Sequence, residues 1–127
     1  MSRAAVSVFA FGIYLYVVGA LLVTVPNRFL GLSGLPPTNE VWVRVVGVLV
    51  LCIATYYTLA ARAGLRAFLV WTVPVRAAVM ASFAMFVGLG LVAPPLLVFG
   101  AADLVGAAWT ALALRADSRG GAAGAGR

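Results

Sequence analysis

Residues 4–25 read AAVSVFAFGIYLYVVGALLVTV and contain no charged side chain. A helix needs about 20 mainly apolar residues to cross the hydrocarbon core of a bilayer, and this stretch supplies them without interruption. Three further apolar runs follow, at about 41–61, 67–92 and 94–114. Each contains one charged residue, which is Arg44, Arg76 or Asp103 in turn. The sequence therefore predicts an all-α, polytopic membrane protein.

The composition of the chain supports the same conclusion. Of its 127 residues, 65% are hydrophobic and 9% are charged, and the mean hydropathy is +1.13. A soluble domain is usually about half apolar and a quarter charged. Because a chain this short leaves much of its surface exposed, it cannot hide so large an apolar excess from water. We expect the lipid bilayer to surround it.

Short breaks separate the four predicted helices. Glycines and prolines interrupt helix formation after Val25 and around Ala93, and a short cationic turn spans residues 62–66. Short connections favour antiparallel neighbours, so we predict an antiparallel four-helix transmembrane bundle over residues 1–115. The Gly/Ala-rich residues 116–127 have nothing to bury and are predicted to form a flexible cytoplasmic tail.

The arginines are distributed unevenly between the two ends of this bundle. One side has only Arg28, and the other side has six arginines: Arg3, Arg62, Arg66, Arg115, Arg119 and Arg127. Positively charged short loops stay in the cytoplasm. We therefore expect a multi-pass protein of a bacterial-type cytoplasmic (inner) membrane with both termini cytoplasmic. Arginines at helix ends indicate topology, and they do not form the single cationic patch with interleaved aromatics that nucleic-acid binding requires.

The charges within the helices are the candidate functional residues, because each costs several kcal/mol at membrane depth unless it is paired or hydrated. Arg76 lies about 13–14 Å from the start of its helix, and Asp103 lies about 16–17 Å from the same membrane side. We predict that they form an ion pair near the midplane. The pair would be either a ligand, proton or ion site, or a structural clamp. Pro74 is expected to kink the helix beside Arg76.

Arg44 is predicted to lie about one turn deep in the second helix. It could reach Asp103, pair with Glu40, or extend to the outer headgroups. Small residues around Asp103, including Gly100 and Gly106, predict close helix packing. Gly12 and Gly19 lie seven residues apart on the first helix, and they are predicted to offer a packing flank to a partner or a second copy.

Little in the sequence indicates catalysis or metal binding. Histidine is absent, and the single cysteine, Cys52, lies in an apolar run, where it is predicted to be a small buried hydrophobe. We predict no metal site and no cofactor. No nucleophile–base pair or phosphate-binding loop is visible, so no catalytic residue is assigned and enzyme activity is disfavoured.

Two short motifs resemble those of a known group of membrane proteins. Pro26 precedes Leu30-Gly31-Leu32 in the first loop, and Arg44-Val45-Val46-Gly47 opens the second helix. With the four short helices, these motifs resemble the DoxX-like proteins, and the BphX-like small membrane proteins are similar in the same way. The resemblance covers most of residues 5–115. It implies a four-helix bundle, sometimes linked with membrane redox metabolism, and it assigns no catalytic residue.

These features together predict a protein that acts by binding. It would hold an amphipathic or anionic small molecule at the buried Arg76–Asp103 site, or pack as an accessory subunit in a larger membrane complex. The alternative is a transporter or channel in which Asp103 binds a proton or ion. Four helices enclose little space, so that alternative requires a homo-oligomer.

Overall fold

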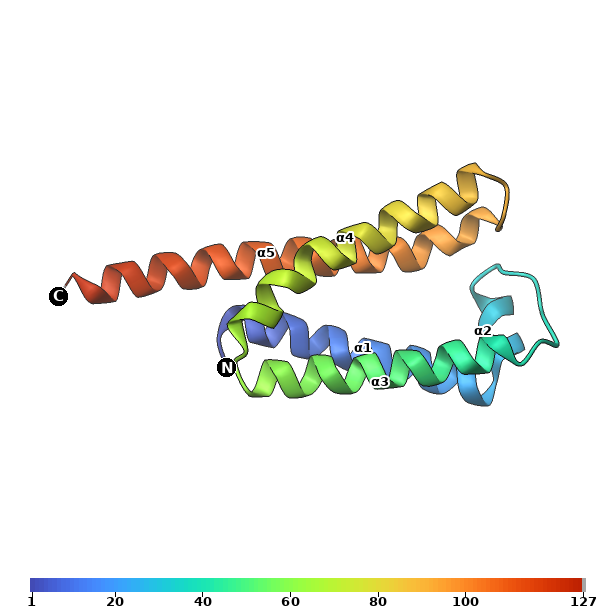
Figure 1. Ribbon diagram of the computed structural model, residues 1–127, viewed down its shortest axis with the longest axis horizontal. Helices are drawn as coiled ribbons and strands as arrows, with labels where there is room; N and C mark the ends of the chain where they lie inside the picture. Colours follow the sequence, from blue (N-terminus) through green and yellow to red (C-terminus); the bar gives the residue numbers. More distant parts are fainter. Residues whose placement is uncertain (127) are drawn as a thin grey trace.

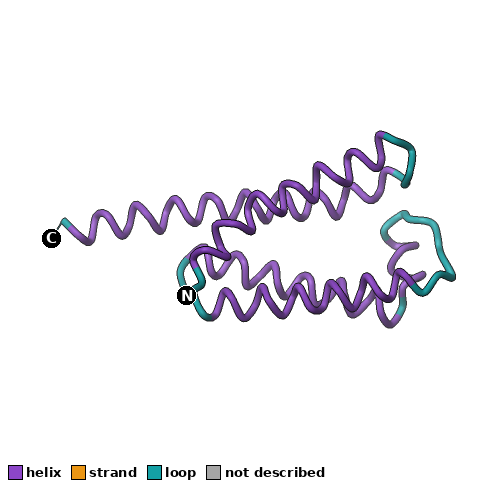
Figure 2. Tube along the Cα trace, viewed as in Figure 1, coloured by secondary structure: helices purple, strands orange, loops and turns teal. Residues whose placement is uncertain are grey.

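The computed structural model describes residues 1–126, which form helices and connecting loops without β-strands (Figure 2). The helices are α1 (Arg3–Thr24), α2 (Pro26–Leu32), α3 (Trp42–Arg62), α4 (Arg66–Gly88), the 3₁₀ helix η1 (Pro94–Leu96) and α5 (Leu97–Ala125). The four long ones are long and apolar enough to cross a membrane. The predicted all-α bundle of four membrane-spanning helices is therefore confirmed.

The four long helices are arranged as two hairpins. α1 packs along α3, α4 packs along α5, and the two hairpins meet mainly where α1 contacts α5. Figure 1 shows the hairpins close together near the N-terminus and farther apart near α2. α4 has few contacts with α1 or α3. The bundle is thus closed along one side only.

We call the end near the N-terminus the arginine-rich end, because it contains Arg3, Arg62, Arg66, Arg115 and Arg119. The Asp117 carboxylate accepts backbone hydrogen bonds from Arg3 at 3.3 Å and Ala4 at 3.0 Å. Acidic groups suit helix N-termini, where backbone N–H groups lack partners within the helix. Asp117 therefore caps α1 and joins it to α5.

The densest part of the core lies toward the arginine-rich end. Its buried residues are mostly small or aromatic: Ala4, Ala5, Val8, Phe11, Tyr57, Ala61, Leu69 and Ala113. Small residues let membrane helices approach closely. The core thereby fixes the hairpins to each other at one end and leaves the other end more open.

Glycines allow α1 and α3 to approach closely. A Cβ atom at Gly12 would lie 2.7 Å from Thr58 Cγ2, and one at Gly19 would lie 3.0 Å from the Gly47 carbonyl oxygen. The prediction that Gly12 and Gly19 face a partner or second copy is therefore wrong. They face α3 of the same chain, because Gly47 provides a matching gap there.

Three helices end in the same glycine-dependent turn. Gly34, Gly64 and Gly90 have positive φ angles of 78°, 62° and 72° after α2, α3 and α4. At each site the following residue donates a backbone hydrogen bond to a carbonyl five residues earlier, as in a Schellman motif. This cap ends α4 at Gly88, four residues before the predicted end at 92. It also ends the short helix α2, which falls in the segment predicted to be a loop.

The segment predicted to be a flexible tail is helical in the structure. α5 continues from Leu97 to Ala125, and Arg127 lies outside the described residues. Alanine is the best helix former, and no proline follows Pro95. The Asp117 contacts with α1 also hold the first turn beyond the bundle. This tertiary contact and the lack of a helix-breaking proline explain the difference.

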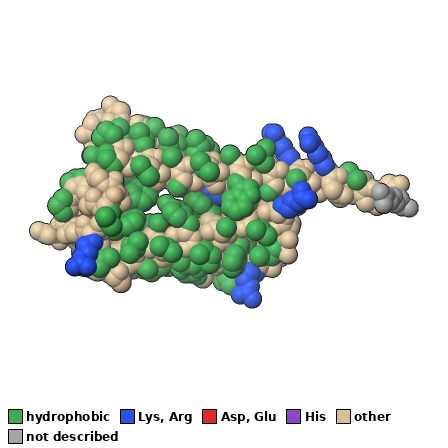
Figure 3. Space-filling view, turned by 180° about the vertical axis from the view of Figure 1, so that it is seen from behind, with side chains coloured by type: hydrophobic (Ala, Val, Ile, Leu, Met, Phe, Trp, Pro, Cys, Tyr) green, Lys and Arg blue, Asp and Glu red, His purple; other side chains and the backbone are tan. Residues whose placement is uncertain are grey.

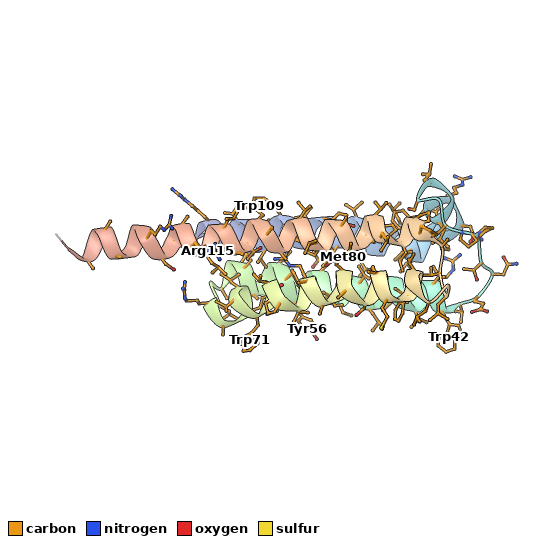
Figure 4. The ribbon with its side chains drawn as sticks, turned by 90° about the horizontal axis from the view of Figure 1, so that it is seen from above. Trp42, Tyr56, Trp71, Met80, Trp109 and Arg115 are labelled. Carbon is orange, nitrogen blue, oxygen red and sulfur yellow. The ribbon has the colours of Figure 1, made fainter. Side chains whose placement is uncertain are left out.

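On the face seen in Figure 3, apolar side chains are spread over the middle of the molecule and arginines lie toward its two ends. Trp42, Tyr56 and Trp71 point outward along one side of the molecule, and Trp109 lies on the other side (Figure 4). Tyr57 is buried although Tyr56 is exposed, so the two point to different sides of α3. Cys52 is exposed, so the prediction that it is buried is wrong. It lies on the outer face of α3.

Candidate functional site

Arg76 lies in the core as the centre of a polar network that joins all four long helices. Its side chain is 1% exposed. Nη2 donates a hydrogen bond of 2.6 Å to Thr110 Oγ1 of α5, and Nε donates to the Thr72 carbonyl at 3.4 Å. Thr110 Oγ1 lies 2.9 Å from Ser7 Oγ of α1. Thr72 Oγ1 donates to the Tyr57 hydroxyl of α3 at 2.7 Å.

Aromatic rings complete the surroundings of the Arg76 guanidinium. Its central carbon lies 4.6 Å from the centre of the Phe11 ring and 5.9 Å from that of Tyr57. Such cation–π contacts stabilise a guanidinium that has lost its hydration. Nη1 has no hydrogen-bond partner among the described residues. A Cβ at Gly106 would lie 2.7 Å from it, so glycine at this position lets α5 lie directly against the guanidinium.

The predicted Arg76–Asp103 ion pair is not formed. No arginine side-chain nitrogen lies within 4.0 Å of a carboxylate oxygen in residues 1–126, and hydroxyl and carbonyl oxygens bind Arg76 instead. Side chains on a helix lean toward its N-terminus. Because α4 and α5 run in opposite directions, Arg76 leans toward the arginine-rich end and Asp103 leans away from it. Similar depth in the membrane therefore does not bring the two groups together.

The other predicted site residues, Arg44, Pro74 and Gly100, lie in separate parts of the bundle. Arg44 donates a hydrogen bond from Nη1 to the Val23 carbonyl near the end of α1, so it joins neither Asp103 nor Glu40. α4 continues through Pro74 and changes direction in its N-terminal half, which contains this proline (Figures 1 and 2). Gly100 lies against Met80 and Phe83 of α4.

Asp103 lines a cavity of about 300 Å³ where the hairpins diverge. We call it the Asp103 cavity. All five α-helices contribute to its wall, and its lining residues are Tyr14, Leu15, Val18, Leu22, Phe29, Leu30, Leu35, Val43, Val46, Val50, Phe83, Leu96, Phe99 and Asp103. The space-filling view shows the molecule hollowed between the two hairpins (Figure 3). This volume is at the lower end of the range for small-molecule sites.

The lining of this cavity is almost entirely apolar. Asp103 and the Tyr14 hydroxyl are the only polar side-chain groups in its described lining. Aromatic rings of Tyr14, Phe29, Phe83 and Phe99 contribute to the wall, and the Phe29 and Phe99 rings lie 5.6 Å apart. Apolar walls with a small number of placed polar groups are typical of sites for small organic molecules.

Comparison of the chain with protein-family models, curated proteins and solved structures gives no match.

The resemblance to DoxX-like and BphX-like proteins therefore stays a prediction. The functional reading rests on the two sites described above, which are the Arg76 network and the Asp103 cavity. The described residues contain no group of three or more side chains of the types that hold metal ions.

Several residues of these sites were not predicted from the sequence. Ser7, Thr72 and Tyr57 belong to the Arg76 network. Thr72 lies one helical turn before Arg76, so the spacing of hydroxyl residues could have indicated it. By contrast, Phe29 and Phe99 meet only because α2 folds back over the open end. No pattern within one helix indicates that contact.

Proposed function

We propose that this protein is a multi-pass membrane protein that binds an amphipathic organic cation in the Asp103 cavity. The supporting observation is a carboxylate in the wall of an apolar cavity, with no ion-pair or hydrogen-bond partner among residues 1–126. A cationic head would lie beside Asp103, and an apolar body would contact the aliphatic residues of α1 and α3.

Two physical effects favour a cation over a neutral amphipath. An ionised carboxylate in apolar surroundings is costly unless an opposite charge accompanies it. Aromatic ring faces also attract organic cations, and quaternary ammonium groups are recognised in this way. Tyr14, Phe29, Phe83 and Phe99 supply such rings around Asp103. The carboxylate and the aromatic wall therefore favour the same class of ligand.

The arrangement gives less support to an anionic ligand at Arg76. An anion would have to reach a side chain that is 1% exposed and whose cationic group already contacts Phe11, Tyr57 and Thr110. Opening this network would disrupt the contacts that join the four helices. We therefore assign Arg76 a structural role and Asp103 the binding role.

We also propose a bacterial-type cytoplasmic membrane as the location, with the arginine-rich end in the cytoplasm. Five arginines at that end and two at the other, Arg28 and Arg44, support this orientation through the positive-inside rule. The Asp103 cavity would then lie in the half of the membrane that faces away from the cytoplasm.

Binding can be tested with three probes that share a decyl chain: decyltrimethylammonium, decanol and decyl sulfate. Calorimetric titration of the protein in nanodiscs should give saturable binding of the ammonium probe and much weaker binding of the other two. Asp103→Asn should remove the preference for the cation. Glu40→Gln is the matched control, because Glu40 is an exposed carboxylate in the loop before α3 and does not line the cavity.

Equal binding of all three probes, or an unchanged preference in Asp103→Asn, would contradict the proposal. Val50→Phe, which fills the cavity, separates site occupancy from adsorption to the nanodisc. Native mass spectrometry from the original membrane tests the other two functions. Larger subunits released together with the protein would favour an accessory role, and a stable oligomer would favour the transporter.

A further inference from the structure

A second hollow runs along the outer seam between α1 and α5, and Tyr14 at its inner end also lines the Asp103 cavity. Its deeper part has a volume of about 480 Å³ and contains Ala10, Ala101 and Gly106. Its outer part has a volume of about 420 Å³ and contains Arg3, Val6 and Ala116. Trp109 lines both parts, and we call the two parts together the α1–α5 groove.

We infer that the α1–α5 groove binds an anionic phospholipid, with one acyl chain in the groove and the phosphate at Arg3. The floor suits a chain because alanines and a glycine leave a shallow channel, and larger apolar residues, including Val105 and Leu112, border it. Val105, Trp109 and Leu112 are each at least half exposed, so a lipid reaches the groove directly from the bilayer.

The length of the groove matches one leaflet. On α1 the lining extends from Arg3 to Tyr14, which corresponds to about 16–17 Å along a helix. Half of the hydrocarbon core is about 15 Å thick. A lipid whose head lies at the arginine-rich end would therefore place its acyl chain along the full groove and end near the midplane.

The charges at the mouth of the groove favour an anionic head group. Arg3 lines the mouth, and Arg119 follows Ala116 by three residues on the same stripe of α5. The nearby acid, Asp117, is already engaged by the backbone N–H groups of Arg3 and Ala4. A guanidinium can bind phosphate through two parallel hydrogen bonds. This site is separate from the proposed cation site and does not depend on it.

Fluorescence quenching by brominated lipids tests this inference directly. Trp42→Phe and Trp71→Phe leave Trp109, which lies in the groove, as the single tryptophan. In phosphatidylcholine nanodiscs, a minor fraction of phosphatidylglycerol brominated on one acyl chain should quench Trp109 more than the same fraction of brominated phosphatidylcholine. Arg3→Gln should lower the relative affinity for the anionic lipid about fivefold, and Arg3→Lys should largely retain it.

Matched variants separate the groove from general surface charge. Arg62→Gln removes a cation from the same end but on α3, and should retain the preference. Ala101→Leu fills the groove and should abolish it, whereas Ala108→Leu, at an exposed site of α5 outside the groove, should not. Excess inorganic phosphate should leave the quenching unchanged. Equal quenching by the two lipids, equal effects of Arg3→Gln and Arg62→Gln, or displacement by inorganic phosphate would each overturn the inference.

Discussion

At the scale of single residues, the unusual feature is a buried guanidinium without a carboxylate partner. Arg76 is bound by Thr110 and Thr72 and contacts Phe11 and Tyr57. The buried charge of Arg76 is therefore stabilised by neutral groups alone. Loss of one of them would leave the guanidinium without a hydrogen-bond acceptor or aromatic contact. Removing an acceptor from such a cation costs more than removing an ordinary interhelical hydrogen bond, which contributes roughly 0.6 kcal/mol in a membrane protein.

Variants of this network should show that losing an acceptor of Arg76 destabilises the protein more than losing an ordinary interhelical hydrogen bond. Thr110→Val leaves Nη2 of Arg76 without its acceptor and should lower the free energy of unfolding by about 1–3 kcal/mol. Ser7→Ala should cost roughly 0.6 kcal/mol. Arg76→Met removes the charge together with its requirements and should cost less than Thr110→Val. Unfolding by detergent titration in bicelles measures all three, with Ser82→Ala as the control. A larger loss in Arg76→Met than in Thr110→Val would contradict this account.

The sequence is sufficient to predict which charges lie within the membrane-spanning helices, but the partners predicted for them are wrong. Arg76 and Asp103 are recognisable because they interrupt apolar runs. The choice of partner depends on the direction in which each side chain leans, and that direction reverses between antiparallel helices. Only the Thr110 hydroxyl binds Arg76 directly, and the hydroxyls of Ser7, Thr72 and Tyr57 extend the network to the other helices. Only the assembled bundle brings them together.

At the scale of helices, the closest approach is between α1 and α3. Cβ atoms at Gly19 and Gly47 would each lie 3.0 Å from the carbonyl oxygen of the other glycine. Backbone atoms cannot rotate away as a side chain can. The two helices would therefore have to separate to accommodate a substitution there, with loss of the packing that joins them.

The close approach of α1 and α3 at Gly19 and Gly47 can be tested with a single added methyl group. Gly47→Ala should lower the free energy of unfolding by about 1–3 kcal/mol, as overpacking does. Gly88→Ala is the matched control, because nothing lies within 4 Å of a Cβ at that position. It should be neutral or slightly stabilising. Equal effects in the same bicelle titration would show that α1 and α3 do not need this close approach.

The positions of the helices are largely readable from hydropathy, whereas their ends depend on local detail. α1 follows the apolar run closely. α4 ends earlier than its apolar run, because Gly90 adopts a positive φ and turns the chain. α5 extends beyond its apolar run, because the Asp117 contacts hold its next turn against α1 and no proline interrupts it. Hydropathy therefore predicts which residues cross the membrane, but it does not predict the residue at which a helix ends.

At the scale of the whole molecule, the sequence predicts the antiparallel bundle but not its divergence into two hairpins. Short connections are sufficient to predict neighbouring antiparallel helices. The divergence depends on where the small residues lie. They concentrate near Ala4, Ala61 and Ala113 at the arginine-rich end. The opposite end has larger side chains, such as Phe29 and Phe99, and this difference leaves the Asp103 cavity.

The proposed orientation can be tested by labelling single cysteines in intact cells. In a Cys52→Ser background, Ser33→Cys lies in the loop after α2, and Ser118→Cys lies on α5 at the arginine-rich end. A membrane-impermeant maleimide should label position 33 in intact cells and position 118 only after lysis. The parent protein with Cys52 alone should stay unlabelled in intact cells, since that residue lies within α3. The reverse pattern would place the arginine-rich end outside.

The divergence of the two hairpins also affects the bilayer itself. A protein that is tightly packed at one end and splayed at the other has a wedge-shaped cross-section, so it displaces different numbers of lipid molecules from the two leaflets. Many copies side by side would give the two leaflets unequal areas. The surrounding membrane would then curve toward the narrow, arginine-rich face.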